Sequence, residues 1–280
     1  MDSKEFGLVS AQQLFQIEDL HYGFWDKDEE AKLSNWKNAQ LKHTQFLFSY
    51  IEKFISNRTN PKILDIGCGT GSATKKLLDK GHIVDGLVPY PWMAKQASDL
   101  IAPYINKNKA NIFECRFEDL STNNKLHKYD LVFFSESFQY VNMQKTFDKL
   151  ERILTKNGII LIFDFFKKDN TIGVSPLGGG HSIGSFFELI KKYNYNTEHD
   201  IDVTKNLSPN LKLVNEILND RLIPFSRTLN KFLLDRHKTV YKIIKFLLKS
   251  RINKMKFKYS SERNEKNFIQ YKTYRMIILS

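Results

Sequence analysis

Three glycines at alternate positions follow a short apolar stretch of the chain. Residues 63–66 have the length and composition of a buried parallel strand, and Gly67, Gly69 and Gly71 interrupt that stretch. Residues 73–78 then have helical character. A strand, a glycine turn and a helix in this order bring the backbone close to a ligand and point free N–H groups at it. The segment is therefore predicted to be a ligand-binding turn.

The spacing of this turn differs from the dinucleotide fingerprint G-x-G-x-x-G, which has an acid about 20 residues further on. Here the pattern is G-x-G-x-G with Asp65 just before it. That pattern resembles the first motif of the class I S-adenosylmethionine-dependent methyltransferases. The resemblance implies that Asp65, Gly67, Cys68, Gly69 and Gly71 bind the methionine and ribose part of S-adenosylmethionine, with Asp65 acting on the methionine ammonium directly or through water. The alternative is an ordinary strand-to-helix turn.

The next expected strand ends without an acid at the usual place. In the family's second motif, a carboxylate there accepts hydrogen bonds from the ribose hydroxyls. Aligning Gly86 and Pro89 with that motif puts Val88 at the acidic position, whereas Asp85 comes three residues earlier and points the other way, because strand side chains alternate. Cyclopropane fatty acid synthases, tocopherol methyltransferases and sterol methyltransferases form a subset that lacks this acid. Val88 and Pro89 are therefore expected to border the cofactor, as in the branch that acts on lipid-like acceptors.

Two further segments resemble the third and fourth motifs of the family. Residues 113–120 resemble the third motif, which implies that Phe117 and Glu118 line the adenine; a plain strand with an acidic cap is the alternative. Residues 129–135 match the strand of the fourth motif, and Ser135 at its end is expected to border the cofactor.

Methyl transfer needs an in-line nucleophile, exclusion of water and sometimes a base. Glu136, at the end of a buried strand, could orient or deprotonate the acceptor, or could be a plain loop carboxylate. His181, after three glycines, could be a base or a structural histidine. Tyr22 lies in His-Tyr-Gly-Phe-Trp, which resembles a segment that folds over cofactor and substrate in the lipid-directed subset; core packing is its alternative. The Asn-Pro-Pro-Tyr type of motif is absent after residue 135, which argues against amino methylation of nucleic-acid bases.

Regular alternation of expected strands and helices predicts an α/β fold around a mostly parallel sheet. The resemblance implies the Rossmann-like seven-stranded methyltransferase fold, with the last strand antiparallel. Expected strands span residues 62–66, 82–87, 111–115, 129–135, 159–165, 197–203 and 271–279. Expected helices include 11–19, 38–55, 72–80, 92–104, 144–154 (closed by Asn157-Gly158) and 185–193.

The chain is expected to divide into four parts. Residues 1–60 form an N-terminal helical cap, 61–204 the cofactor-binding core, 205–270 a helical basic lid inserted over the active site, and 271–280 the final core strand. In the lid, residues 227–258 are rich in lysine and arginine, with Asp235 as their only acid, and apolar residues recur at helical spacing. Such a stretch is typical of a packed helix with a solvated face, of a segment that contacts anionic lipid, or of an RNA-binding surface.

The composition limits the class of protein. The formal net charge is +12. The sequence contains no run of about 18 apolar residues, so no membrane-spanning helix is predicted. The start of the chain has no apolar signal region, and Cys68 and Cys115 are too few for a disulfide framework or a zinc site. We expect a reduced, cytoplasmic protein without a metal, with possible peripheral contact at an anionic membrane surface.

Together these features predict an S-adenosylmethionine-dependent methyltransferase that methylates a small, apolar or amphiphilic molecule by direct in-line transfer. The product of the cofactor would be S-adenosylhomocysteine. The alternatives are an RNA methyltransferase that uses the basic lid, although nucleic acid is not the expected partner, and a cofactor-binding protein without methyl transfer.

Overall fold

The computed structural model describes the chain except for residues 1–2, 16, 20, 122–127, 240 and 242–261. Its centre is a seven-stranded sheet with the order β3-β2-β1-β4-β5-β7-β6. All neighbouring strands pair in parallel except β7, which is antiparallel to both β5 and β6. This is the predicted methyltransferase fold, so the fold class is confirmed. The strands are β1 (Lys62–Ile66), β2 (Ile83–Leu87), β3 (Ile112–Phe113), β4 (Tyr129–Ser135), β5 (Leu154–Lys167), β6 (Thr197–Asp202) and β7 (Lys272–Leu279).

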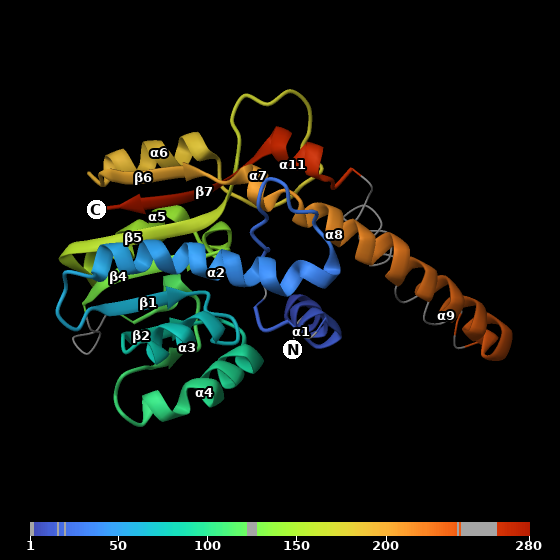
Figure 1. The fold of residues 1–280 in the computed structure, drawn as a ribbon, viewed down its shortest axis with the longest axis horizontal. Helices are drawn as coiled ribbons and strands as arrows, with labels where there is room; N and C mark the ends of the chain where they lie inside the picture. Colours follow the sequence, from blue (N-terminus) through green and yellow to red (C-terminus); the bar gives the residue numbers. More distant parts are fainter. Residues whose placement is uncertain (1–2, 16, 20, 122–127, 240, 242–261) are drawn as a thin grey trace.

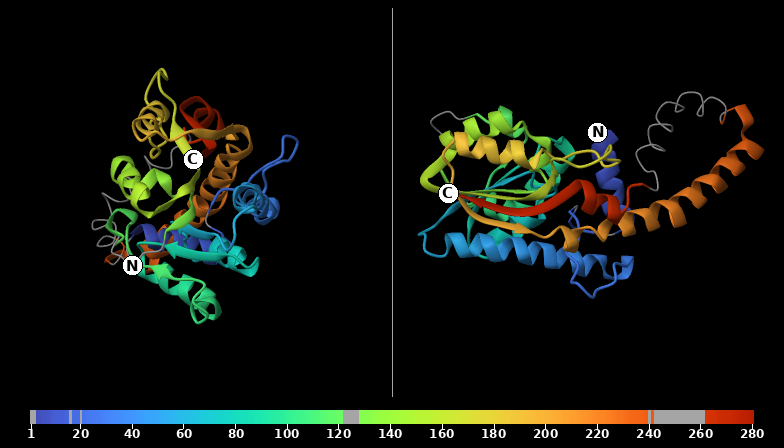
Figure 2. Two further views of the ribbon diagram at one scale, coloured as in Figure 1. Left: turned by 90° about the vertical axis from the view of Figure 1, so that its left-hand side faces the viewer. Right: turned by 90° about the horizontal axis from the view of Figure 1, so that it is seen from above.

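Helices cover both faces of the sheet, as Figure 2 shows from the end and from above. On one face lie α2 (Leu33–Ile55), α3 (Ser72–Asp79) and α4 (Pro91–Ile105); on the other lie α5 (Met143–Ile153) and α6 (Ile183–Lys192). Because both faces are covered, the central strands are apolar without alternation. In β4, Phe133 packs toward α2 and Phe134 packs toward α5, and both are fully buried.

Several element boundaries differ from the predicted ones. Helix α1 (Ser3–Phe15) begins and ends earlier than the expected helix 11–19. Asn157-Gly158, expected to close a helix, lies inside β5, because β5 already begins to pair with β4 at Leu154. Strand β3 has only two residues, since it lies at the edge of the sheet and pairs with β2 alone.

The chain between β6 and β7 is helical where it is described. It contains α7 (Thr204–Leu207), α8 (Asn210–Glu216), a π-helical stretch (Ile217–Leu222), α9 (Ile223–Arg236) and, before β7, α11 (Glu265–Tyr271). α8 packs against the body, and α9 continues from it through the π-helical stretch as a long arm that leaves the body of the molecule (Figure 1). No side chain of α9 is buried. Residues 240 and 242–261 of the expected basic lid lie outside the described residues, so its cover over the active site and the four-part division stay predictions.

Candidate active site

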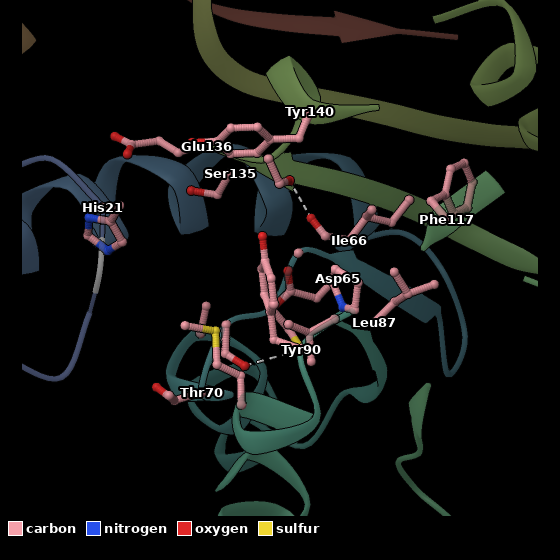
Figure 3. A pocket seen from close by; sticks show the side chains of 18 of the residues that line it. His21, Asp65, Ile66, Thr70, Leu87, Tyr90, Phe117, Ser135, Glu136 and Tyr140 are labelled. Carbon is pink, nitrogen blue, oxygen red and sulfur yellow. Dashed lines mark hydrogen bonds between the residues drawn. The ribbon is translucent and has the colours of Figure 1, made fainter. Parts of the chain in front are cut away.

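A cavity of about 610 Å³ opens where β1, β2 and β4 end. This is the edge at which ligands bind in open parallel sheets. The turns after these three strands form its floor, and residues of the N-terminal segment line another side. Figure 3 shows Asp65 and Tyr90 below, Glu136 and Tyr140 above, and His21 to one side. The volume lies within the range typical of small-molecule sites.

The glycine turn adopts a backbone that other residues would strain. Gly67 has φ of 85°, and a Cβ there would stand 2.3 Å from the Cβ of Ser137. The N–H groups of Gly67 and Cys68 both donate to the Leu87 carbonyl, at 2.8 and 3.1 Å. The turn is thereby tied to the end of β2, and Gly67, Cys68 and Gly69 line the cavity. Gly71 does not line it; with φ of 87°, it lets α3 start against Ala97 of α4.

Asp65 lies at the floor of the cavity with its side chain buried. Thr74 Oγ1 donates a hydrogen bond of 2.8 Å to its Oδ2. Burial raises the pKa of Asp65 and the Thr74 hydrogen bond lowers it; the net result is a pKa raised to about 7. A cationic ligand group beside this carboxyl would favour its ionised form, as the predicted contact with a methionine ammonium requires.

The end of β2 is apolar, as predicted. Val88 is buried with Met93 and Ala97, and it lines the cavity together with Pro89. Asp85 does not line the cavity; it accepts hydrogen bonds from Tyr129 Oη at 2.8 Å and from Asn111 Nδ2 at 2.9 Å. β2 therefore presents no carboxylate to the cavity.

The opposite wall comes from the turn after β3 and the end of β4. Phe117 packs edge-on against Phe134, with ring centroids 5.9 Å apart, and lines the cavity with Glu118. Glu118 Oε1 accepts a hydrogen bond of 2.6 Å from the Asn142 N–H. Ser135 Oγ is buried in the cavity wall and has no hydrogen-bond partner among the described residues. A polar ligand would satisfy that hydroxyl, so the wall suits S-adenosylmethionine, which carries polar groups along its length.

Glu136 directly follows β4 and has a positive φ of 54°. Its Oε1 accepts hydrogen bonds from the Tyr22 N–H at 2.9 Å and from Tyr274 Oη at 3.0 Å. Its side chain is 16% exposed and lines the cavity. Burial raises the pKa of Glu136 to about 8, and the charge of Asp164 adds to that rise. A strained backbone that holds a carboxyl group in a cavity is typical of functional sites.

His43 supports this carboxyl group from behind. Its ring stacks between His21, at a centroid distance of 4.1 Å, and Phe163, at 4.4 Å. Its Nε2 lies 3.2 Å from Tyr274 Oη and 4.0 Å from Glu136. Burial holds the pKa of His43 well below 6.5, so the ring is neutral. Because Tyr274 Oη donates to Glu136, His43 Nε2 carries the proton that Tyr274 accepts.

The other two predicted catalytic residues lie outside the cavity lining. Tyr22 supplies its backbone N–H to Glu136, whereas its phenol packs against the core, and burial raises the pKa of that phenol. His181 Nε2 is 3.0 Å from the Phe138 carbonyl, and its ring packs edge-on against Phe138. His181 thus has the contacts of a structural histidine, the alternative that the sequence left open.

Several cavity residues had no sequence signal. Glu5 and Asp19 come from the N-terminal segment, and Tyr90 comes from the turn after β2. Asp19 Oδ2 accepts from Lys76 Nζ at 3.0 Å, which ties this segment to α3. Only a tertiary contact reveals them, because they belong to no motif.

Comparison with known proteins agrees with this geometry. The family model described as "Methyltransferase domain" matches residues 64–162. Malonyl-[acyl-carrier protein] O-methyltransferase 2 of Ilyobacter polytropus is 36% identical over 110 residues, 38% of this chain and 40% of that protein. A probable chloroplastic tocopherol O-methyltransferase of Oryza sativa is 26% identical over 153 residues, 52% of this chain and 40% of that protein. The chain thus aligns with less than half the length of these two curated relatives.

Solved structures share the fold over nearly the whole chain. A putative sarcosine dimethylglycine methyltransferase from Galdieria sulphuraria has a TM-score of 0.71 at 18% identity, covering 99% of this chain and 98% of that one. The geranyl diphosphate C-methyltransferase of Streptomyces coelicolor has a TM-score of 0.67 at 12% identity, covering 97% and 91%. The family match over residues 64–162 and the shared fold confirm the predicted resemblance to the class I S-adenosylmethionine-dependent methyltransferases.

Proposed function

We propose that the protein transfers a methyl group from S-adenosylmethionine to a small amphiphilic acceptor. The observation that carries this proposal is the position of Glu136, which lines the same cavity as the glycine turn of residues 67–69. A group that can take a proton thus shares one cavity with the expected cofactor residues. The relatives and the fold agree with this assignment.

The residues expected to hold the cofactor surround the cavity floor and wall. Asp65 and residues 67–69 would hold the methionine end, Val88 and Pro89 would border the ribose, and Phe117, Glu118 and Ser135 would border the adenine side. When bound, S-adenosylmethionine supplies an electrophilic methyl group on a sulfonium. The protein's contribution is to orient the two reactants and exclude water.

Glu136 is proposed to bind and deprotonate the acceptor. The Tyr22 N–H and the Tyr274 hydroxyl fix the carboxyl group, and the neutral His43 leaves its charge uncompensated. A pKa of about 8 places its titration near neutral pH, where a general base is most effective. An acceptor O–H or N–H beside Glu136 would lose its proton to this carboxylate.

The acceptor is proposed to be amphiphilic. The cavity combines carboxyl groups with aromatic rings, since Tyr90 and Tyr140 line it together with Met93. The named relatives and neighbours are named for malonyl-[acyl-carrier protein], tocopherol and geranyl diphosphate. Tocopherol and geranyl diphosphate each join an apolar part to a polar one. An acceptor of this general kind fits the mixed lining.

We also propose that α9 contacts an anionic membrane surface. Leu222, Phe225, Leu229 and Phe232 are spaced three or four residues apart and are 41–65% exposed. Arg227, Lys231 and Arg236 lie on the same helix. Apolar side chains combined with cations are typical of helices that lie in the interface of anionic lipids. The arm leaves the body on the same side as α1 (Figure 1), and Glu5 of α1 lines the cavity.

Sedimentation with lipid vesicles tests the membrane contact. The protein should sediment with vesicles that contain phosphatidylglycerol and not with pure phosphatidylcholine. Leu229→Ser with Phe232→Ser should abolish sedimentation, whereas Leu41→Ser with Leu100→Ser, at exposed positions on α2 and α4, should leave it intact. Steep salt-dependent RNA binding without vesicle binding would favour the RNA methyltransferase instead.

The methyl-transfer proposal is tested in two steps. Calorimetry should show binding of S-adenosylmethionine and S-adenosylhomocysteine. Transfer of labelled methyl should then appear with at least one acceptor among a malonyl thioester, geranyl diphosphate, a tocopherol precursor and phospholipid. Binding without turnover on any of these acceptors would favour a cofactor-binding protein, and absence of binding would overturn the proposal.

A further inference from the structure

Helix α1 brings a buried carboxylate to the cofactor side of the cavity. Glu5 is 2% exposed and lines the cavity together with Val88, Pro89 and Tyr90. Its Oε1 accepts a hydrogen bond of 3.0 Å from the Trp92 N–H in the first turn of α4. Glu5 and Trp92 are 87 positions apart in the chain, so the contact exists only because α1 docks here.

Glu5 thus places an acid on the side of the cavity where the end of β2 has none. Helix capping alone would not require a distant glutamate, because the side-chain oxygen of a Ser, Asp or Asn at the Tyr90 cap position could accept the same N–H locally. The chain instead has an apolar β2 end at Val88 and a glutamate from α1 beside it.

We propose that Glu5 accepts hydrogen bonds from the ribose hydroxyls of the cofactor, in place of an acid at the end of β2. The inference rests on the proposed cofactor site. β2 and its flank offer no acid to the ribose. Asp85 accepts hydrogen bonds from Tyr129 and Asn111, and position 88 is a valine. A carboxylate can accept about four hydrogen bonds, and two vicinal hydroxyls need two of them.

The rest of α1 is attached across the same cavity. Gln12 Nε2 donates to Thr70 Oγ1 at 3.3 Å, and Thr70 belongs to the glycine turn. The side chain of Val9, also on α1, is buried. The helix is therefore held at one side by the turn after β1 and at the other by the start of α4. Cofactor binding through Glu5 would stabilise this docked position, because the coupling between the two is reciprocal.

The test compares two ligands in three proteins by calorimetry. The ligands are S-adenosylhomocysteine and its 2′-deoxy analogue; the proteins are the wild type, Glu5→Gln and the matched control Glu18→Gln. Glu18 comes from the same N-terminal segment and also lines the cavity, but it is 67% exposed and pairs with Lys37 at 3.8 Å. Glutamine keeps the shape of the side chain and an acceptor for Trp92, so α1 should stay docked.

The wild type and Glu18→Gln should bind S-adenosylhomocysteine with similar affinity and discriminate against the deoxy analogue. Glu5→Gln should bind S-adenosylhomocysteine about 10- to 100-fold more weakly, because charge-assisted bonds are lost. It should lose most of the discrimination between the two ligands. Adding Val88→Asp to Glu5→Gln should restore part of the affinity and part of the discrimination between the two ligands, since it returns an acid to the end of β2.

Two results would overturn the inference while leaving the methyl-transfer proposal intact. One is wild-type affinity in Glu5→Gln. The other is an equal loss for both ligands, which would mean that Glu5 only docks α1. If the wild type itself binds neither ligand, the proposed function fails first.

Discussion

The helices before β1 and helix α9, in the segment between β6 and β7, meet the core in opposite ways. The N-terminal region buries Trp25 to 1% exposure and sends α2 side chains such as Ile51 into the main core. In the arm, Phe225 and Phe232 of α9 remain 65% and 55% exposed. The N-terminal region also lines the cavity, whereas none of the described residues between 205 and 270 does.

The two regions meet at the base of the arm. Asn210, at the start of α8, bonds both backbone groups of Gly23: its Oδ1 accepts at 2.8 Å and its Nδ2 donates at 2.6 Å. Gly23 packs so closely that a Cβ would stand 2.6 Å from the Cβ of Ala39. The packed part therefore includes α8, and the change from cover to free arm falls within the π-helical stretch Ile217–Leu222. Apolar composition alone does not decide which helix becomes a cover; a complementary surface does.

The largest effect on activity is expected at Glu136, the carboxyl group that the N-terminal region contacts through the Tyr22 N–H. Glu136→Gln removes the proposed base but keeps an acceptor for the Tyr22 N–H. Methyl transfer should fall by about 10²- to 10⁴-fold. Binding of S-adenosylhomocysteine should change little. Single-turnover rates and calorimetry check both, and an unchanged rate would leave Glu136 a plain loop carboxylate.

Stability should separate the two regions directly. Trp25→Ala removes a fully buried ring and should lower the free energy of unfolding by about 3–5 kcal/mol. Phe232→Ala on α9 should change it by no more than about 0.5 kcal/mol, because the ring is already largely exposed. Urea denaturation measures both. Equal losses would mean that α9 packs against the protein in solution.

The pH dependence of stability should reflect the buried acids of the cavity region. Burial raises the pKa of Asp65 and Asp164 to about 7 and that of Glu136 to about 8. Below about pH 6.5 these acids are opposed by buried histidines such as His43, whose pKa is lowered and which the unfolded chain protonates more readily. Above about pH 6.5 the folded protein keeps carboxyl protons that the unfolded chain has lost, so the free energy of unfolding should fall as pH rises from about 6.5 to about 8. Urea melts across this range, without ligand, measure the slope. Glu136→Gln should make it shallower, and a stability that rises with pH would contradict the assignment.

A smaller change should follow from the contact behind Glu136. Burial raises the pKa of Glu136, and the hydrogen bond from Tyr274 Oη partly counteracts that rise. Tyr274→Phe deletes this hydrogen bond. The pKa of Glu136 should rise further, so the acidic limb of the pH profile of kcat/KM should move toward alkaline pH. The rate above that limb should stay close to that of the wild type. A uniform loss at every pH would instead indicate a structural role for Tyr274.

The parts of the site that could be predicted are those built from consecutive residues. The turn after β1, the missing acid at Val88 and the position of Glu136 follow from strand and turn patterns within one motif each. Glu5 could not be predicted, because its partner Trp92 is 87 positions away and α1 has no motif. His181 was ambiguous for a similar reason, since its contact with the Phe138 carbonyl depends on how the loop after β5 folds back.

By itself the sequence determined the alternation of strands and helices along the chain, the mostly parallel sheet and the edge at which the cavity opens. These depend on local periodicity and on glycines such as Gly67, whose positive φ is a property of a few adjacent residues. Only the tertiary structure decided that Glu5 of α1 lines the cavity, that the Tyr22 N–H reaches Glu136, and that no described residue of α9 lines the cavity. The hydrogen bond from Tyr22 to Glu136 spans 114 positions, and such contacts depend on how complementary two distant surfaces are, which residue spacing does not encode.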